Sequence, residues 1–321
     1  MPSGSVSVIV NIFNAAVLAG VPLLLGTVGE IITEKSGHLN LGVEGLMYIG
    51  AAFGFAAGYF ANSAMIALLC AFAGGVLGSF IYAVLTVTLR ANQNVTGLTL
   101  TVFGTGFANY IGDALINSTA SKAVSLSPEV KAAFAPLNIY GLSSLPVIGK
   151  LLFQYNIFVY LAIIIAILAG LYLNRTRTGL NLRAIGENPA AADAMGVRVA
   201  RYKYINIMLG GGICALGGAY VAIVTCGGTW IYNCVSGQGW IAVALVIFAG
   251  WSTYRALVGS LVFGSLSIIR FYLPGGRVPP ALLAMLPFIV TCVVLVVASV
   301  HSSRSNRQPA ACGVNYYREE R

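Results

Sequence analysis

The sequence predicts an all-α fold: a polytopic transmembrane helical bundle of about 8–10 spans, with one short helix outside the membrane. Two bulk observations support this. Of the 321 residues, 58% are hydrophobic and only 8% are charged, whereas a soluble domain carries roughly 25% charged residues. The mean hydropathy is +0.86. Because so few charges cannot cover a globular surface, lipid is the expected solvent.

Apolar runs of about 18 or more residues mark the candidate spans. They are Val6–Val28, Leu39–Ala61, Ala64–Leu89, Val95–Ile116, Ile157–Leu173, Tyr204–Val224, Leu257–Leu273 and Leu282–Val300. A further run, Trp240–Trp251, covers only about 18 Å at ~1.5 Å per residue. It either extends back through Ile231 to cross fully or is a broken helix.

Lysine and arginine predict the orientation, because basic residues near span ends favour the cytoplasmic side. If the N-terminus is outside and all these runs cross, 13 of the 18 basic residues fall inside: Lys35, Arg90, Arg175, Arg177, Arg183, Arg198, Arg201, Lys203, Arg255, Arg304, Arg307, Arg318 and Arg321. The other five fall outside: Lys122, Lys131, Lys150, Arg270 and Arg277. We therefore expect a multi-pass membrane protein with a cytoplasmic C-terminus.

This topology divides the chain into a transmembrane domain, residues 1–304, and a cytoplasmic tail, residues 305–321. Within the domain, residues 113–155 are expected to form a small extracellular cap, since the segment is rich in proline and serine. Residues 174–203 form a cytoplasmic loop.

The cytoplasmic loop contains the signals of a short helix. Asn188 is a good N-cap, and Pro189 suits the first helical position because it lacks an amide hydrogen. Residues 190–195 favour helix, and Asp193 is expected early enough to suit the helix dipole. Gly196 supplies a left-handed stop. The pattern predicts about two turns faced with small side chains, which suit a groove in another protein; a plain surface loop helix is the alternative.

Several blocks resemble a known family of transport proteins. Arg183–Val197 is similar to the coupling loop of permeases in the branched-chain amino acid and simple-sugar transport superfamily. Ile32–Met47 resembles a signature of the nucleoside-type branch, and Ala91–Leu100 and the Trp240–Trp251 run leading into Gly259–Gly264 agree. The resemblance covers residues 30 to 265 in order.

The resemblance implies the membrane-spanning permease subunit of an ATP-binding-cassette (ABC) importer in a bacterial cytoplasmic membrane. Its solute would be a nucleoside or a related small polar compound, such as a simple sugar or a riboflavin-like molecule. Its partners would be an ABC ATPase subunit, a second permease subunit (homologous or identical) and an extracellular substrate-binding lipoprotein. ATPase coupling is then expected at Gly186, Glu187, Asn188, Pro189, Ala192, Asp193 and Gly196. Lys35, His38 and the Cys226–Cys234 stretch depart from the pattern and leave the solute open.

The chain itself is expected to carry no cofactor, no metal and no catalytic residue. It lacks the G-x-x-x-x-G-K-[ST] run of nucleotide-binding loops, so the partner subunit would use the ATP. The two histidines, His38 and His301, have no cysteine or aspartate at metal-ligand spacing. Cys226 and Cys234 share a loop in which a disulfide is possible.

Polar residues at the start of two spans have two possible roles. Glu44 lies just inside the second span with glycines around it, so it either binds freed amides or lines the pathway in a broken helix, or ties spans together as a structural carboxylate. The candidate pathway residues are Asn40, Glu44, Asn92, Gln93, Asn94 and Thr96. The last four equally suit helix capping.

Glycines recur at helical spacing inside the predicted spans. Gly50, Gly54 and Gly58 share one helix face, as do Gly74 and Gly78, which predicts close helix packing. An ion-coupled secondary transporter of a small polar solute is the alternative function. We expect it to show several buried carboxylates, whereas the sequence indicates only Glu44 as embedded, with Glu30 and Asp113 near span ends.

Overall fold

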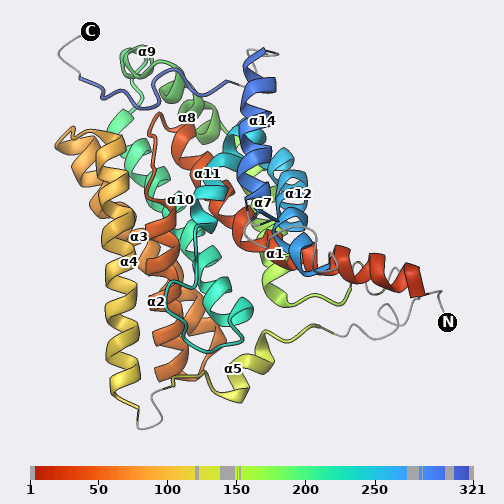
Figure 1. Ribbon diagram of the computed structural model, residues 1–321. Helices are drawn as coiled ribbons and strands as arrows, with labels where there is room; N and C mark the ends of the chain where they lie inside the picture. The colour runs from red at the N-terminus through yellow and green to blue at the C-terminus, as the bar shows by residue number, and fades with distance from the viewer. Residues whose placement is uncertain are drawn as a thin grey trace.

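The computed structural model describes residues 4–119, 123–137, 149, 151, 153–272, 282–283, 285–300 and 307–317. Over these residues the regular secondary structure is helical, and one isolated bridge pairs Ser125 with Thr229; this confirms the predicted all-α class. The helices are α1 (Gly4–Lys35), α2 (Val43–Ala61), α3 (Ala64–Ala83), α4 (Gln93–Asn117), α5 (Pro128–Ala133), α7 (Ile157–Arg175), α8 (Arg177–Glu187), α9 (Pro189–Ala194), α10 (Val199–Tyr220), α11 (Gln238–Phe248), α12 (Thr253–Tyr272) and α14 (Leu286–Val300), with π-helical turns η1 (Val84–Thr88) and η2 (Val221–Thr225) continuing α3 and α10 (Figure 1).

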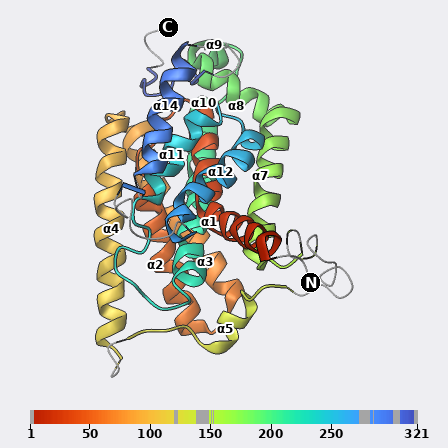
Figure 2. The same cartoon turned by 45° about the vertical axis from the view of Figure 1, so that its right-hand side comes forward.

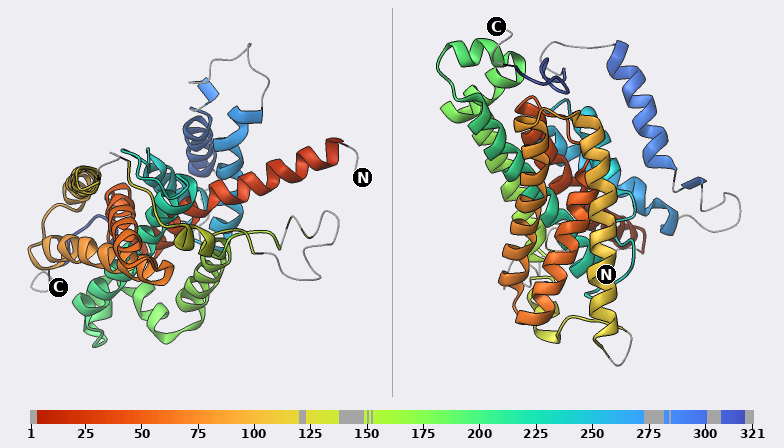
Figure 3. Two further views of the ribbon diagram at one scale, coloured as in Figure 1. Left: turned by 90° about the horizontal axis from the view of Figure 1, so that it is seen from below. Right: turned by 90° about the vertical axis from the view of Figure 1, so that its left-hand side faces the viewer.

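The bundle is built around α1, α2, α3 and α10, which pack against one another. Helix α4 packs on α2 at one side, whereas α7 and α12 pack on α1 at the other (Figure 2). The N-terminal part of α1 projects beyond the other helices, and α14 lies at the edge against α11 and α12 (Figure 3). Helices α8 and α9, the ends of α1 and α3, and residues 307–317 gather at one end of the bundle, which we call the α9 end (Figure 1).

Within the part of the chain that the structure describes, five helices are long and apolar enough to cross a membrane: Val10–Lys35, Val43–Ala61, Ala64–Thr88, Ile157–Arg175 and Val199–Thr225. Helix α4 has the necessary length at 25 residues, but it contains more polar residues. The apolar helices Gln238–Phe248 and Thr253–Ile269 are shorter. The polytopic helical architecture therefore agrees with the prediction.

The run around Trp240 forms a short helix. Helix α11 has 11 residues and begins after Gly237, at φ 86°; the chain turns again at Gly250, at φ 54°. Both values lie in the left-handed region that favours glycine and ends helices. At ~1.5 Å per residue, 11 residues reach only about 16 Å, so α11 by itself does not cross a bilayer. The broken-helix alternative is correct.

Helix α1 ends seven residues later than the apolar run that predicted it. The apolar run stops at Val28, yet the helix continues to Lys35 with Glu30 and Glu34 inside it. Both carboxylates are buried and bonded: Glu30 accepts a hydrogen bond from the Asn40 amide at 3.0 Å, and Glu34 accepts one from the Trp251 indole. Hydropathy could not predict these distant partners.

The glycines at helical spacing bring helices together as predicted. A Cβ on Gly50 would lie 2.0 Å from the Ala215 carbonyl oxygen of α10, and one on Gly75 would lie 2.4 Å from that of Gly211. Gly54 and Gly58 face α3, and Gly78 faces Leu46 and Ile49 of α2. These contacts bury the faces of α2, α3 and α10 against one another.

The proposed cap, residues 113–155, is described only in part. Helix α5 lies at the end of the bundle opposite α9, and the segment before it pairs with the loop after η2, where the Leu126 amide donates to the Gly228 carbonyl at 2.8 Å (Figure 1). Residues 138–148, including Pro146, lie outside the described residues.

Candidate functional site

Helix α9 forms as the sequence predicts. The Asn188 side-chain oxygen accepts a hydrogen bond from the Ala191 amide at 3.0 Å, and Pro189 takes the first helical position. Gly196 has φ +81°, and the Val197 amide returns to the Ala192 carbonyl at 3.1 Å. Local capping therefore fixes both ends of this helix.

Asp193 does not lie near the start of α9, and the expectation that it suits the helix dipole is wrong. It is the fifth of six helical residues, where the dipole is negative. Its carboxylate instead accepts a hydrogen bond from the Tyr316 hydroxyl at 2.9 Å. The partner lies 123 positions further along the chain, so no local pattern indicated it.

Helix α9 is seated on the bundle through small apolar contacts. Ala192, Ile185 of α8 and Val199 of α10 form a buried cluster. Gly186 packs on α1 so closely that a Cβ would lie 2.5 Å from the Lys35 carbonyl oxygen. By contrast, Glu187 and Asn188 are exposed, and Met195 is 85% exposed. Helices α8 and α9 together form the α8–α9 hairpin. One face of this hairpin is thus fixed to the bundle, and the other face is open.

The described part of the C-terminal tail packs along the α9 end. The Ala311 amide donates to the Gly186 carbonyl at 2.9 Å, and the Asn315 side-chain amide donates to the Arg90 carbonyl at 2.6 Å. The Arg90 guanidinium lies over the Tyr317 ring, 4.5 Å from its centroid. The tail therefore connects the α8–α9 hairpin to the turn between η1 and α4, a contact that the sequence analysis missed.

Glu44 binds the amides at the N-terminus of α11. Its two carboxylate oxygens accept hydrogen bonds from Gly237 N at 2.7 Å and Gly239 N at 2.6 Å. The Tyr48 hydroxyl accepts one from Ser236 N at 3.2 Å. Glu44 is buried at 5% exposure. This geometry combines two of the predicted roles: Glu44 satisfies freed amides and ties α2 to a neighbouring helix.

The other polar candidates make structural hydrogen bonds. The Asn40 side chain accepts from the Gly42 amide at 2.9 Å, in the turn before α2. The Asn92 side chain caps α4 by accepting from the Asn94 and Val95 amides, and the Thr96 hydroxyl donates to the Asn92 carbonyl. Gln93 accepts from the Leu39 amide at 2.8 Å and donates to Asn315 at 3.2 Å. The Asn94 side chain is exposed. A role for any of them in the pathway stays a prediction.

The count of embedded carboxylates needs correction. Glu30 and Glu34 are buried at 0% and 3% exposure, so Glu44 is one of three buried carboxylates on α1 and α2. The expectation that only Glu44 is embedded was wrong because the apolar run ended at Val28. With three buried carboxylates, the number of such groups does not distinguish a permease from an ion-coupled carrier.

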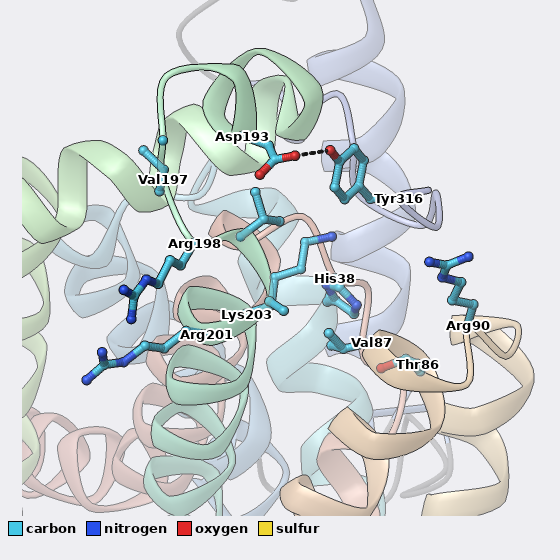
Figure 4. A pocket seen from close by; sticks show the side chains of 13 residues that line it. His38, Thr86, Val87, Arg90, Asp193, Val197, Arg198, Arg201, Lys203 and Tyr316 are labelled. Carbon is cyan, nitrogen blue, oxygen red and sulfur yellow. Dashed lines mark hydrogen bonds between the residues drawn. The ribbon is translucent and has the colours of Figure 1, made fainter. Parts of the chain in front are cut away.

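A cavity of about 400 Å³ lies beneath α9. It is lined by residues of the turn after α1, η1, the end of α9, the start of α10 and the tail, including His38, Thr86, Arg90, Asp193, Lys203 and Tyr316 (Figure 4). Burial lowers the pKa of His38 well below its usual value, and the Lys203 charge lowers it further. His38 is therefore neutral at physiological pH.

Comparison with known proteins identifies relatives over most of the chain. Residues 11–295 match the model of the family described as branched-chain amino acid transport system / permease component. The guanosine ABC transporter permease protein NupQ of Bacillus subtilis is 34% identical over 90% of this chain and 92% of its own. TsgC13 of Haloferax volcanii, whose name assigns it to a glucose ABC transporter, is 34% identical over 81% of this chain and 77% of its own.

A solved ABC transporter structure in an inward-facing conformation has a similar fold. It has a TM-score of 0.50 and 12% identity, over 90% of this chain and 85% of that chain. At this identity the likeness concerns the fold alone.

Proposed function

This chain belongs to the branched-chain amino acid transport system permease family, and from that premise we propose how it works within an ABC importer. As a permease subunit it provides membrane-spanning helices and has no hydrolytic role of its own. ATP hydrolysis is then carried by a separate ABC ATPase subunit. A second permease subunit, homologous or identical, and an extracellular substrate-binding lipoprotein complete the assembly.

The single observation that carries this proposal is the α8–α9 hairpin. Its inner face is fixed to α1 and α10 through Gly186 and Ala192, and its outer face, with Glu187, Asn188 and Met195, is open. A helix held in this way moves with the spans on either side of it. The α9 end therefore faces the cytosol in our proposal, and α9 transmits closure of the ATPase dimer to α7 and α10.

Replacing Gly196 tests the coupling role. Gly196 has φ +81°, a conformation that costs a β-branched residue on the order of 1–3 kcal/mol. A valine at this position therefore favours a different φ, and the chain then leaves α9 in a different direction. We expect solute uptake by the G196V transporter to fall at least tenfold while membrane insertion and basal ATP hydrolysis persist. Gly106 on α4 is the matched control, since a Cβ there meets no atom within 4 Å. Wild-type uptake by G196V would contradict the coupling role.

The proposed solute is a nucleoside, because the nucleoside-type signature lies in Ile32–Met47 and the guanosine permease matches over nearly the full chain. A simple sugar is the other candidate, supported by the relative named for glucose. Uptake of radiolabelled guanosine in cells that express the complete transporter, with unlabelled nucleosides or glucose as competitors, distinguishes the two. Competition by glucose alone would replace the nucleoside assignment with the sugar.

A further inference from the structure

The cavity beneath α9 holds a buried cation that has no anionic partner in the described ranges. Lys203 is 3% exposed, and among the described residues its ammonium group makes no hydrogen bond and no ion pair. Burial of an unpaired ammonium ion is costly, because the low-dielectric interior does not replace its hydration. Lys203 therefore lacks a counterion in the protein as described.

His38 lies beside Lys203 in the same cavity (Figure 4). It is 1% exposed, and neither of its buried ring nitrogens makes a well-formed hydrogen bond among the described residues. A neutral imidazole has one N–H to donate. Both ring nitrogens have almost no exposed surface, so the Lys203 ammonium ion is the donor that faces the cavity, with the buried imidazole beside it.

The surrounding charges also favour an anion. Arg90 lies at the edge of the cavity with its guanidinium over the Tyr317 ring. The Arg198 and Arg201 guanidinium groups point away from Lys203 and add to the positive field from outside (Figure 4). The lining carboxylate, Asp193, accepts a hydrogen bond from Tyr316. Cys312 also lies near Lys203, but burial and the Glu34 charge raise its pKa, so it remains a neutral thiol.

We propose that this cavity is a binding site for a phosphate group, held by the Lys203 ammonium ion with Arg90 at its edge. A phosphate offers several strong acceptor oxygens to these donors at once. The volume of about 400 Å³ is many times the roughly 30 Å³ of a water molecule, so it accepts an anion with part of its hydration. Free phosphate compounds and the headgroups of anionic lipids carry this chemistry.

Thermal unfolding of the full-length chain in phosphatidylcholine bilayers, with inorganic phosphate as the probe, tests the site. Phosphate should raise the unfolding temperature of the wild type by several degrees, since a ligand that binds only the folded state stabilises it. Sodium chloride at the same ionic strength should not. In the K203M variant the apparent affinity for phosphate should fall by about tenfold or more, the loss of one charged hydrogen bond.

Lys203→Met also separates binding from folding. Without phosphate, K203M should unfold at the same temperature as the wild type or above it, because an unpaired buried charge is gone. The control K131M removes a half-buried lysine that donates to Ser125, at the end opposite α9, and should respond to phosphate like the wild type. An equal phosphate response in K203M and wild type, or a lower unfolding temperature for K203M, would overturn the proposal.

Bilayers that contain phosphatidylglycerol distinguish the sources. If phosphatidylglycerol alone raises the unfolding temperature and added phosphate then has no effect, the ligand is a lipid headgroup. If added phosphate still raises the unfolding temperature, the ligand is a soluble phosphate compound. Glu319 and Glu320 are carboxylates of the tail that lie outside the described residues. The E319Q/E320Q variant, measured in parallel, tests whether they supply the anion for Lys203. A phosphate response seen only in that variant would mean that the chain supplies its own anion and would refute the proposal.

Discussion

Glu44 shows how a single carboxylate can hold a broken helix in the interior of the bundle. The amides of Gly237 and Gly239 would otherwise be buried helix-terminal donors without partners, and each such donor costs about 1–3 kcal/mol. A Cβ on Gly239 would lie 2.4 Å from the Glu44 Cα, so the two backbones are in close contact. The carboxylate and this close packing together hold the start of α11 against α2.

Substitution of Glu44 tests this role. Glu44→Ala should destabilise the protein by about 2–5 kcal/mol, since two amides lose their acceptors. Glu44→Gln keeps one acceptor oxygen and should lose about half as much. Thermal unfolding of the purified variants measures the difference. Equal stability of E44A and wild type would show that the α11 amides have other acceptors.

Cys226 and Cys234 form a thiol pair in the loop between η2 and α11. Both are free thiols. The hydrogen bond from Cys234 lowers the pKa of Cys226, and burial partly opposes this shift. The same hydrogen bond and burial raise the pKa of Cys234. The Cys226 thiolate therefore forms at a lower pH than its partner's.

The reaction with an alkylating reagent should follow this order. Because the thiolate is the reactive form, Cys226 should be alkylated before Cys234 as pH rises towards 9. In the C234A variant the donor is gone, so the half-maximal alkylation rate of Cys226 should move to a higher pH. Mass spectrometry of alkylated peptides measures both. An unchanged pH profile in C234A would contradict the hydrogen bond.

At the scale of helices, local sequence signals predicted α9 correctly, but they did not predict contacts between residues far apart in the chain. Asn188, Pro189 and Gly196 act on neighbouring backbone groups, so sequence determines both ends of α9. The late end of α1 depends instead on partners of Glu30 and Glu34 that lie elsewhere in the chain. The Tyr316 contact with Asp193 is likewise tertiary. For the proposed phosphate site, the one indication in the sequence was that His38 differs from the residue expected in the family pattern.

Helix packing through glycine gives a test at the same scale. In the Gly50→Ala variant the new Cβ would lie 2.0 Å from the Ala215 carbonyl oxygen, so α2 and α10 must separate. We expect a loss of about 1–3 kcal/mol or more in the free energy of unfolding. The control G106A adds a Cβ in open space. Equal unfolding temperatures of G50A and G106A would mean that the two helices can move apart at little cost.

For the whole molecule, hydropathy predicted the class and the order of the spans but not how each one crosses. Among the described helices, five meet the length and composition of a membrane span, whereas α4 is more polar and α11 is only 11 residues long. These elements are stabilised by neighbouring helices, as the Glu44 contact shows. Family membership, rather than the number of buried carboxylates, separates the permease from an ion-coupled carrier.

The orientation of α9 is the central claim, and labelling of a Met195→Cys variant tests it most directly. Met195 is 85% exposed at the end of α9, so a cysteine there should react readily. With a membrane-impermeant maleimide, and the unsubstituted chain as background, we expect labelling only after cells are permeabilised, and protection when the ATPase subunit is co-expressed. Labelling of M195C in intact cells would place α9 outside and contradict the account.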